Sequence, residues 1–347
     1  MRRLWPAAAV AACLAFVCGP GAAARWGQSP WGLSPHAEAA AGVRVPTGYR
    51  VSIVARGLTH PTTLAWGPSG RLLATEDVGR LVEIRNGRPR LLASGLETPL
   101  GLARWDDSLF VSETGRLERL RLSHGRVVSR TVLVSGLPAK LHQQDNVVVG
   151  PDGRLYLGSG STCDACSEQD TRSATILSVH RDGSDLHVVA TGLRNPYGLA
   201  FDPRTNRLYA SVNGRDRLGA HEPAEMVVRI RFGARYGWPR CWPSWRLRRL
   251  VGSCRGVARP AAYLEPHSSA DGLAFWRGAL YVAEWGQYDS DRAGRRVVRI
   301  DLGRNGFAQR ATTFATGFDH PLALLPAGRG LLVGDWGRGI VYRISKR

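Results

Sequence analysis

Residues 137–166, LPAKLHQQDNVVVGPDGRLYLGSGSTCDAC, contain two apolar runs on either side of the turn Gly150-Pro151-Asp152-Gly153. Proline fixes φ in such a turn, and aspartate and glycine accept the chain reversal. Residues 147–149 and 155–158 are therefore predicted to form a β-hairpin. His142 lies just before the first strand. It is either a histidine of a surface loop or a functional group at the mouth of the hairpin, and this stretch alone leaves both open.

The same hairpin pattern recurs along the chain in six copies. Each copy begins with Gly-Leu or a close relative, continues with proline and an apolar strand, and ends with a third strand close to Arg-Ile. The copies start at Gly57, Gly95, Gly136, Gly192, Glu265 and Gly317. Short strands and turns repeated every ~40 residues are typical of a β-propeller. The fold class is therefore predicted to be all-β, a six-bladed β-propeller whose proline-containing strands line the central channel.

The last copy ends with its third strand, whereas the segment Tyr49–Ala55 belongs to no copy. We expect this N-terminal strand to be the fourth strand of the last blade. Such a closure would remove two exposed sheet edges at once.

The N-terminus resembles an export signal. Arg2 and Arg3 precede an apolar stretch from Ala7 to Val17, and three alanines at 22–24 offer a cleavage site. The apolar stretch is too short to span a bilayer, and no later stretch is predicted to cross one. Residues 1–24 are predicted to be a signal peptide, 25–44 a linker and 45–347 the propeller. The protein is expected to be exported, periplasmic or secreted, and lipid anchoring at Cys18 is disfavoured by its poor cleavage box.

Four cysteines lie outside the signal. Cys163 and Cys166 form a Cys-x-x-Cys motif, and Cys241 and Cys254 follow later. A zinc site would need a second such pair, and a thioredoxin-type motif would need a helix N-terminus. Because export permits disulfides, we predict two of them, 163–166 and 241–254.

The formal net charge is +19, from 47 Lys and Arg against 28 Asp and Glu, and nearly all of the excess is arginine. Arginine-rich gene composition is the simplest interpretation, and a basic channel for a polyanionic small molecule is the next. Nucleic acid is not expected as a partner, because no reading helix, zinc knuckle or aromatic RNA-binding motif is present. The Trp- and Arg-rich insertion 236–263 is expected to be a disulfide-pinned loop over one mouth, or else a contact for a partner or a membrane surface.

Five motifs together resemble a known family. They are His142 eight residues before Gly150, GLRNPYGLAFDP from Gly192, VNGRD from Val212, YGWPRCW from Tyr236 and PHSSADGLAFW from Pro266. In this order they resemble the soluble sugar dehydrogenases that use pyrroloquinoline quinone (PQQ), most closely the L-sorbosone dehydrogenase branch. The resemblance covers roughly residues 45–347.

The resemblance implies roles for matching residues. His142 would be the general base that takes the proton of the substrate hydroxyl, which suits an imidazole because its pKa lies near neutrality. Arg194 and Asn195 would contact the quinone oxygens, where a guanidinium stabilises developing negative charge. A calcium ion would be held by the main-chain carbonyls of Gly214 and Arg215, with Asp216 adjacent.

The sequence also departs from the family pattern. Ser161 stands where the glucose-oxidising members have an aspartate that orients the base. Residues 319–322, Asp-His-Pro-Leu, lack an arginine pair that holds cofactor carboxylates. Arg215, Arg217 and Lys140 are predicted to supply the positive charge instead.

The predicted function is an exported PQQ- and calcium-dependent dehydrogenase that oxidises a sugar or sugar-derived aldehyde and passes electrons to an external acceptor. A second candidate is a metal-dependent hydrolase of the lactonase type, with polar groups from different copies around an axial metal: Glu76, Glu113, Asn195, Asn213 and Glu284. A third is a non-catalytic binding propeller, favoured by the missing arginine pair and the Trp/Arg insertion.

Overall fold

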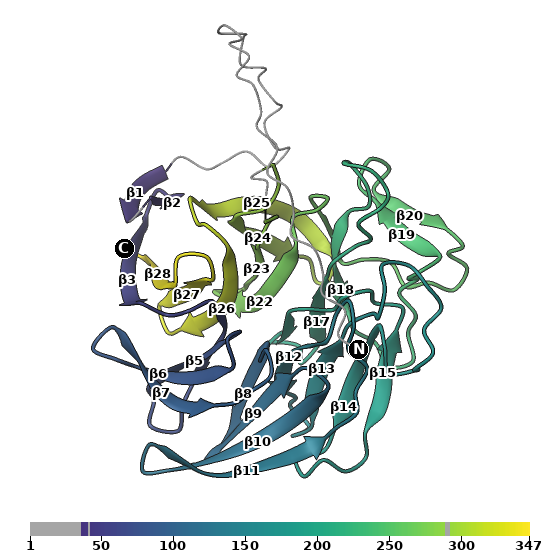
Figure 1. The fold of residues 1–347 in the computed structure, drawn as a ribbon. Helices are drawn as coiled ribbons and strands as arrows, with labels where there is room; N and C mark the ends of the chain where they lie inside the picture. Colours follow the sequence, from purple (N-terminus) through teal and green to yellow (C-terminus); the bar gives the residue numbers. More distant parts are fainter. Residues whose placement is uncertain (1–35, 41, 289–291) are drawn as a thin grey trace, which may run out of the picture. The chain divides into compact units, whose positions relative to one another are not determined.

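Six β-sheets form a ring within the unit that begins at Trp31 (Figure 1). The computed structural model describes residues 36–40, 42–288 and 292–347, the first five of these as backbone only. Every regular element in these ranges is a strand. The predicted all-β, six-bladed propeller is confirmed.

The blades follow the predicted copies, each listed from its innermost strand outward. Blade one is β4 (Pro61–Trp66), β5 (Leu72–Glu76), β6 (Arg80–Arg85) and β7 (Arg88–Ser94); blade two is β8 (Gly101–Trp105), β9 (Ser108–Glu113), β10 (Arg116–Ser123) and β11 (Arg126–Val134); blade three is β12 (Gln144–Val149), β13 (Leu155–Ser159), β14 (Thr175–Val179) and β15 (His187–Thr191). Blade four is β16 (Leu199–Phe201), β17 (Leu208–Val212), β18 (Glu225–Arg229) and β21 (Ala262–Leu264); blade five begins with β22 (Ala270–Trp276), β23 (Ala279–Glu284), β24 (Arg296–Leu302) and β25 (Ala308–Thr316); blade six is β26 (Pro321–Ala327), β27 (Gly330–Asp335), β28 (Ile340–Lys346) and β3 (Tyr49–Arg56). A separate hairpin, β19 (Cys241–Ser244) and β20 (Arg249–Gly252), belongs to the Trp/Arg insertion.

The N-terminal strand β3 completes the last blade. It pairs antiparallel with β28, from Lys346 opposite Tyr49 to Ile340 opposite Arg56. Strand β28 is therefore paired on both sides, and β3 becomes the outermost strand of blade six.

The predicted linker 25–44 is wrong in its C-terminal part. Strands β1 (His36–Ala40) and β2 (Val43–Pro46) form an antiparallel hairpin, and Arg44 of β2 pairs with Thr316 of β25. The hairpin therefore extends blade five to six strands. Val43 and Val45 are fully buried while Arg44 is exposed, the alternation of a half-buried strand. It was too short to stand out in the sequence.

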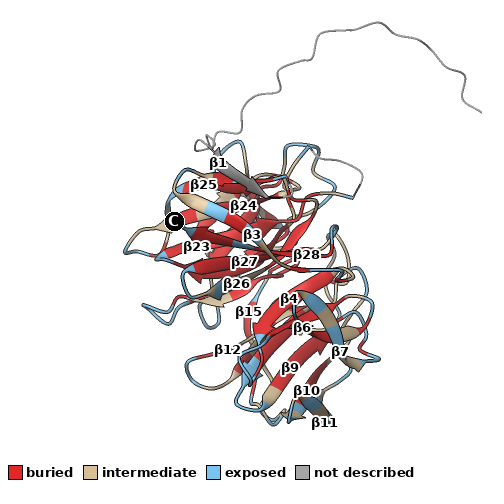
Figure 2. Cartoon of the chain, turned by 90° about the vertical axis from the view of Figure 1, so that its left-hand side faces the viewer, coloured by how far each residue is buried: buried red, intermediate tan, exposed pale blue. Residues whose placement is uncertain are grey.

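Hydrophobic layers between neighbouring blades hold the ring together, and Figure 2 shows the buried residues concentrated on the inner strands of the blades. Near the axis the inner strands approach so closely that a glycine is required. A Cβ at Gly272 would lie 1.9 Å from the carbonyl oxygen of Leu322, and one at Gly198 would lie 2.2 Å from that of Asp271. These contacts join the first residues of successive inner strands, so the inner strands all begin at one face, called the site face below.

Both predicted disulfides are present, Cys163–Cys166 and Cys241–Cys254. The predicted signal peptide 1–24, with Cys18, lies outside the described residues. Within the described ranges no helix is long and apolar enough to span a membrane.

Candidate active site

His142 lies at the site face, immediately before the inner strand of blade three, and is half-buried. Its Nδ1 is 3.1 Å from both the carbonyl oxygen and the hydroxyl oxygen of Ser161. A carbonyl oxygen only accepts hydrogen bonds, so Nδ1 carries the hydrogen and Nε2 carries the lone pair in the neutral ring. The Ser161 hydroxyl donates to the carbonyl of Cys163 at 2.7 Å. The serine therefore fixes the tautomer without any carboxylate.

The pKa of His142 is lowered from 6.5 to about 4. Burial is the main cause, because it disfavours the charged ring, and the nearby Arg194 guanidinium acts in the same direction. The imidazole is therefore neutral at physiological pH, the protonation state that a general base needs.

Arg194 is buried, at 4 % exposure, and its position is fixed by two carboxylates. Its Nη2 lies 3.0 Å from Asp164 and 2.5 Å from Asp216, while its carbonyl accepts from the amide of Ser161 at 2.7 Å. Its Nε is buried with no hydrogen-bond partner among the described residues. A buried guanidinium N–H without an acceptor destabilises the folded protein. A bound ligand that accepts this hydrogen bond would remove that cost.

Asn195 brings a second unsatisfied group to the same place. It is 6 % exposed, and its Oδ1 lacks a hydrogen-bond partner among the described residues. Gly160 separates it from the histidine: a Cβ there would lie 2.3 Å from the Cβ of His142 and 2.8 Å from the Oδ1 of Asn195. The structure thus brings together His142, Arg194 and Asn195 from blades three and four.

Gly214 and Arg215 follow the second strand of blade four at the same face. The Gly214 amide donates to the Glu225 carboxylate at 2.5 Å. In the described structure neither carbonyl of this pair accepts a hydrogen bond, so two consecutive oxygens remain available to a cation. Asp216, by contrast, is committed to Arg194.

A hollow of about 600 Å³ lies beside this group, lined in part by Asp164, Arg215, Asp216 and Arg217. The Cys163–Cys166 loop forms one wall. Lys140 is exposed and is not among the lining residues, so the structure does not bring it to the hollow.

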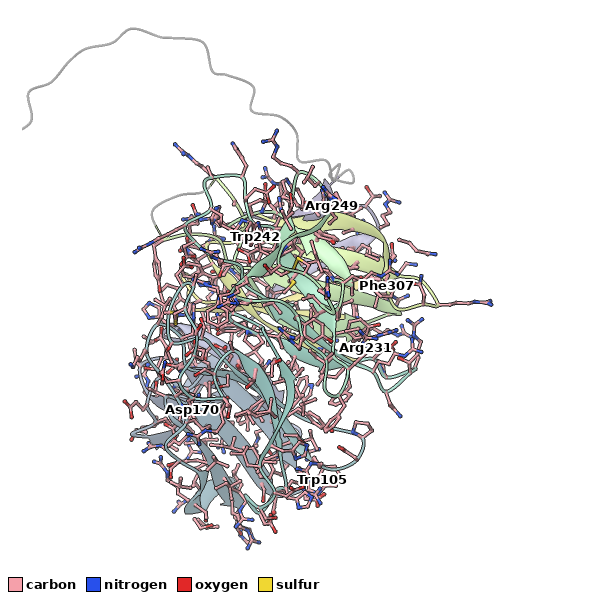
Figure 3. The ribbon with its side chains drawn as sticks, turned by 90° about the vertical axis from the view of Figure 1, so that its right-hand side faces the viewer. Trp105, Asp170, Arg231, Trp242, Arg249 and Phe307 are labelled. Carbon is pink, nitrogen blue, oxygen red and sulfur yellow. A yellow bond between two sulfur atoms is a disulfide. The ribbon has the colours of Figure 1, made fainter. Side chains whose placement is uncertain are left out.

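The Trp/Arg insertion flanks the same hollow. Trp238 Nε1 donates to the carbonyl of Asp164 at 2.9 Å, and the Arg215 guanidinium lies 5.8 Å from the ring of Trp242. Trp242 and Arg249 mark the two strands of the insertion's hairpin in Figure 3. The insertion therefore supports the walls of the site.

A buried acidic layer next to the site was not anticipated. Asp145 and Asp271 lie at the start of the inner strands of blades three and five, β12 and β22, at 2 % and 4 % exposure. Burial raises the pKa of Asp271 to about 7, and burial together with the Asp271 charge raises the pKa of Asp145 well above its usual range. The hydroxyl of Tyr197 is likewise buried, with no partner among the described residues. The sequence feature that could have revealed these buried carboxyl groups is an aspartate at the start of an inner strand, where apolar residues are usual.

A second missed residue is Arg295. Its Nη1 lies 3.4 Å from Asp319, within the stretch that lacks the family's arginine pair. Its Nε is buried without a partner in the described structure. Arg295 of blade five therefore brings a positive charge to residues 319–322 of blade six, which contain no arginine.

The carboxylates proposed for a hydrolase do not form an axial metal site. Glu76, Glu113 and Glu284 each end the second strand of a blade. Each is ion-paired with an arginine at the start of the next strand of the same blade: Arg80, Arg116 and Arg296. They therefore stabilise the blades. The metal-type cluster of His, Cys, Asp and Glu found among the described residues is Cys163, Cys166 and Glu168, and its cysteines are oxidised.

The glucose/sorbosone dehydrogenase family model matches residues 107–290, more than half of the chain. The chain belongs to this family.

Three proteins similar to this glucose/sorbosone dehydrogenase family protein share 22–27% identity with it. Quinoprotein glucose dehydrogenase B of Acinetobacter calcoaceticus is 22% identical over 253 residues, 54% of this chain and 52% of that protein. A Thermus thermophilus structure named as an oxidoreductase (glucose dehydrogenase) is 27% identical, with a TM-score of 0.72 over 86% of this chain and 100% of that one. The PQQ-bound aldose sugar dehydrogenase of Streptomyces coelicolor shares the fold, with 24% identity and a TM-score of 0.71 over 87% and 99% of the two chains.

Proposed function

We propose that the protein is a PQQ-dependent dehydrogenase that oxidises a sugar or a sugar-derived aldehyde. The observation that carries the proposal is the neutral, oriented imidazole of His142 beside Arg194 and Asn195 in a chain of this family. An oriented imidazole beside a buried N–H donor and a buried oxygen that both lack protein partners is a typical arrangement of a catalytic base next to a cofactor site.

His142 is the general base of the proposed reaction. Its Nε2 accepts the hydroxyl proton of the sugar, or of the hydrate of the aldehyde, while the carbonyl of Ser161 holds the Nδ1 hydrogen. The resulting imidazolium faces Arg194, which disfavours it, so the proton must pass onward to complete turnover. The absence of a carboxylate partner makes this base weaker than one paired with aspartate.

The residues present fit a bound quinone. The Nε of Arg194, which lacks a protein partner, would donate to an acceptor atom of the cofactor, and the Oδ1 of Asn195 would accept from a donor. Arg215 and Arg217 line the hollow. Arg295 offers a further cation for a carboxylate. PQQ, when bound, supplies the two-electron acceptor for the substrate hydride.

A calcium ion fits the Gly214 and Arg215 carbonyls, which are hard oxygen ligands without partners in the described structure. Asp216 is better assigned to fixing Arg194. The sequence alone instead predicts Asp216 to be part of the metal site.

The opposite side of the site face offers an aromatic wall for a sugar. His60 stacks on Trp336 at 3.9 Å between ring centroids, and His320 lies 4.1 Å from Trp285. These residues come from blades one, five and six. Flat rings suit the C–H faces of a sugar ring, and aromatic side chains commonly line small-molecule sites. The two disulfides fit an exported protein.

Reconstitution tests the proposal. The purified protein is incubated with PQQ and calcium, and reduction of an artificial electron acceptor is measured with a panel of aldoses and sugar aldehydes. Activity should require PQQ and fall at least about 100-fold in His142→Gln, as expected on loss of a general base. His124→Gln, on the outer turn of blade two, is the matched control and should retain activity. Absence of both quinone binding and activity would overturn the proposal.

A further inference from the structure

A second hollow, of about 840 Å³, lies at the face opposite the site face. It is lined by Arg50, Ser52, Arg277, Arg329, Arg343, Ser345, Lys346 and Arg347, and these residues are called the basic hollow here. They come from β3, from β28 and the end of the chain, and from the inner turns of blades five and six. The inner strand of blade six runs from Pro321 at the site face to Ala327 beside this hollow.

The basic hollow has an unbalanced charge. Its lining contains six cationic side chains and no aspartate or glutamate. Among the described residues, Arg50, Arg277, Arg329, Arg343 and Lys346 form no ion pair with a carboxylate. At the start of the third strands of blades one and two, by contrast, Arg80 and Arg116 are paired with Glu76 and Glu113. These five like charges therefore repel one another with no ion-paired carboxylate among the described residues.

Strand pairing fixes this arrangement. Arg343 lies opposite Ser52 and Ser345 lies opposite Arg50 in the β3–β28 ladder, so the four side chains share one face of the sheet. The Arg50 Nε donates to the Ser345 hydroxyl at 3.2 Å, and the Arg343 Nη2 donates to the carbonyl of Ala327 at 3.3 Å. Two of the cations are thus held over a rigid sheet, and the turns that carry Arg277 and Arg329 close the sides.

We propose that the basic hollow binds a compact polyanion that carries two or more phosphate groups. Guanidinium groups pair with phosphate through two parallel hydrogen bonds, and several of them converge here. The volume is that of a small-molecule site. The lining contains no aromatic side chain, so nothing in it can stack a nucleic-acid base, as single-strand binding requires. Phosphate groups of this kind occur in free polyphosphates and in diphosphorylated lipid headgroups.

The test measures binding of two probes to the full protein. Inorganic tripolyphosphate is titrated by calorimetry, and vesicles of phosphatidylcholine with and without cardiolipin are tested by co-sedimentation. The variant Arg50→Ser/Arg329→Ser/Arg343→Ser removes three cations and should weaken tripolyphosphate binding at least about tenfold, since each charge-assisted contact contributes on that scale. Binding of the vesicles in addition would identify a headgroup as a possible source, and binding of tripolyphosphate alone would identify a free polyanion.

The matched control Arg90→Ser/Arg126→Ser/Arg310→Ser removes the same charge from exposed positions outside the hollow. It should bind tripolyphosphate within about twofold of the parent protein, because it leaves the lining of the hollow intact. A nonspecific attraction, which depends on net charge, would instead fall equally in both triple variants. If the triple variant unfolds, the single variant Arg329→Glu in an exposed turn replaces it, with the same expected direction. The proposal is wrong if the parent binds neither probe, or if both triple variants lose binding equally. Dye-linked dehydrogenase activity should be unchanged in either variant, which separates this result from the test of the site face.

Discussion

Replacing Arg194 by methionine is expected to raise the pKa of His142. The guanidinium and burial both hold this pKa down, at about 4 against the ordinary 6.5. The substitution removes the positive charge and also leaves Asp164, which already favours the protonated ring, without its partner. Both changes stabilise the imidazolium. Burial is the larger cause and remains, so the pKa should rise by about one pH unit and stay below 6.5.

The depressed pKa is also a statement about stability. A shift from 6.5 to about 4 corresponds to about 3 kcal/mol. The unfolded chain binds this proton first, so the native state loses stability as the pH falls from 6.5 toward 4. Above 6.5 the contribution is constant. In Arg194→Met this acid-side loss should be smaller.

The assay is NMR titration of labelled histidine, with the His142 signal assigned by its disappearance in His142→Gln. It requires neither cofactor nor activity. Arg90→Met removes one exposed positive charge from the outer strand of blade one and serves as the matched control, in which the midpoint should not move. A midpoint at or above 6.5 in the parent protein, or no rise in Arg194→Met, would refute the account of the site.

The other predictions concern buried charges and the cross-link. Asp271→Asn should stabilise the fold increasingly from pH 4 to pH 8, by at most about 4 kcal/mol, because the native carboxyl with its pKa of about 7 keeps a proton that the unfolded chain releases; urea unfolding at several pH values measures this, and a pH-independent difference would contradict it. Arg296→Met leaves the fully buried Glu284 without its cation and should cost about 3–5 kcal/mol in the free energy of unfolding; a loss below about 1 kcal/mol would show that the pair is unimportant. Replacing Cys241 and Cys254 by serine opens a cross-link of sequence separation 13 and should cost about 3 kcal/mol, seen as a lower Tm; an unchanged Tm would mean that the insertion is held by its other contacts.

The family resemblance predicts positions only for site residues that lie within a sequence motif. His142, Arg194 and Asn195 lie within short motifs whose neighbours set the local backbone, so their sequence context predicts their place at a strand mouth. Arg295 belongs to no such motif. It reaches Asp319, 24 positions away, through the packing of blade five on blade six.

The sequence by itself determined the repeat, the turns between strands, the ring of six blades and the two cross-links. These follow from local rules: alternation of apolar residues, Gly, Pro and Asp at reversals, and cysteines close along the chain. Only the tertiary structure decided that strands β1 and β2 extend blade five, that the charge of Asp271 acts on the buried Asp145, and that Arg50 and Ser345, 295 positions apart, share the basic hollow. Such contacts depend on which segments, far apart in the sequence, become neighbours when the ring closes. No local sequence pattern specifies those neighbours.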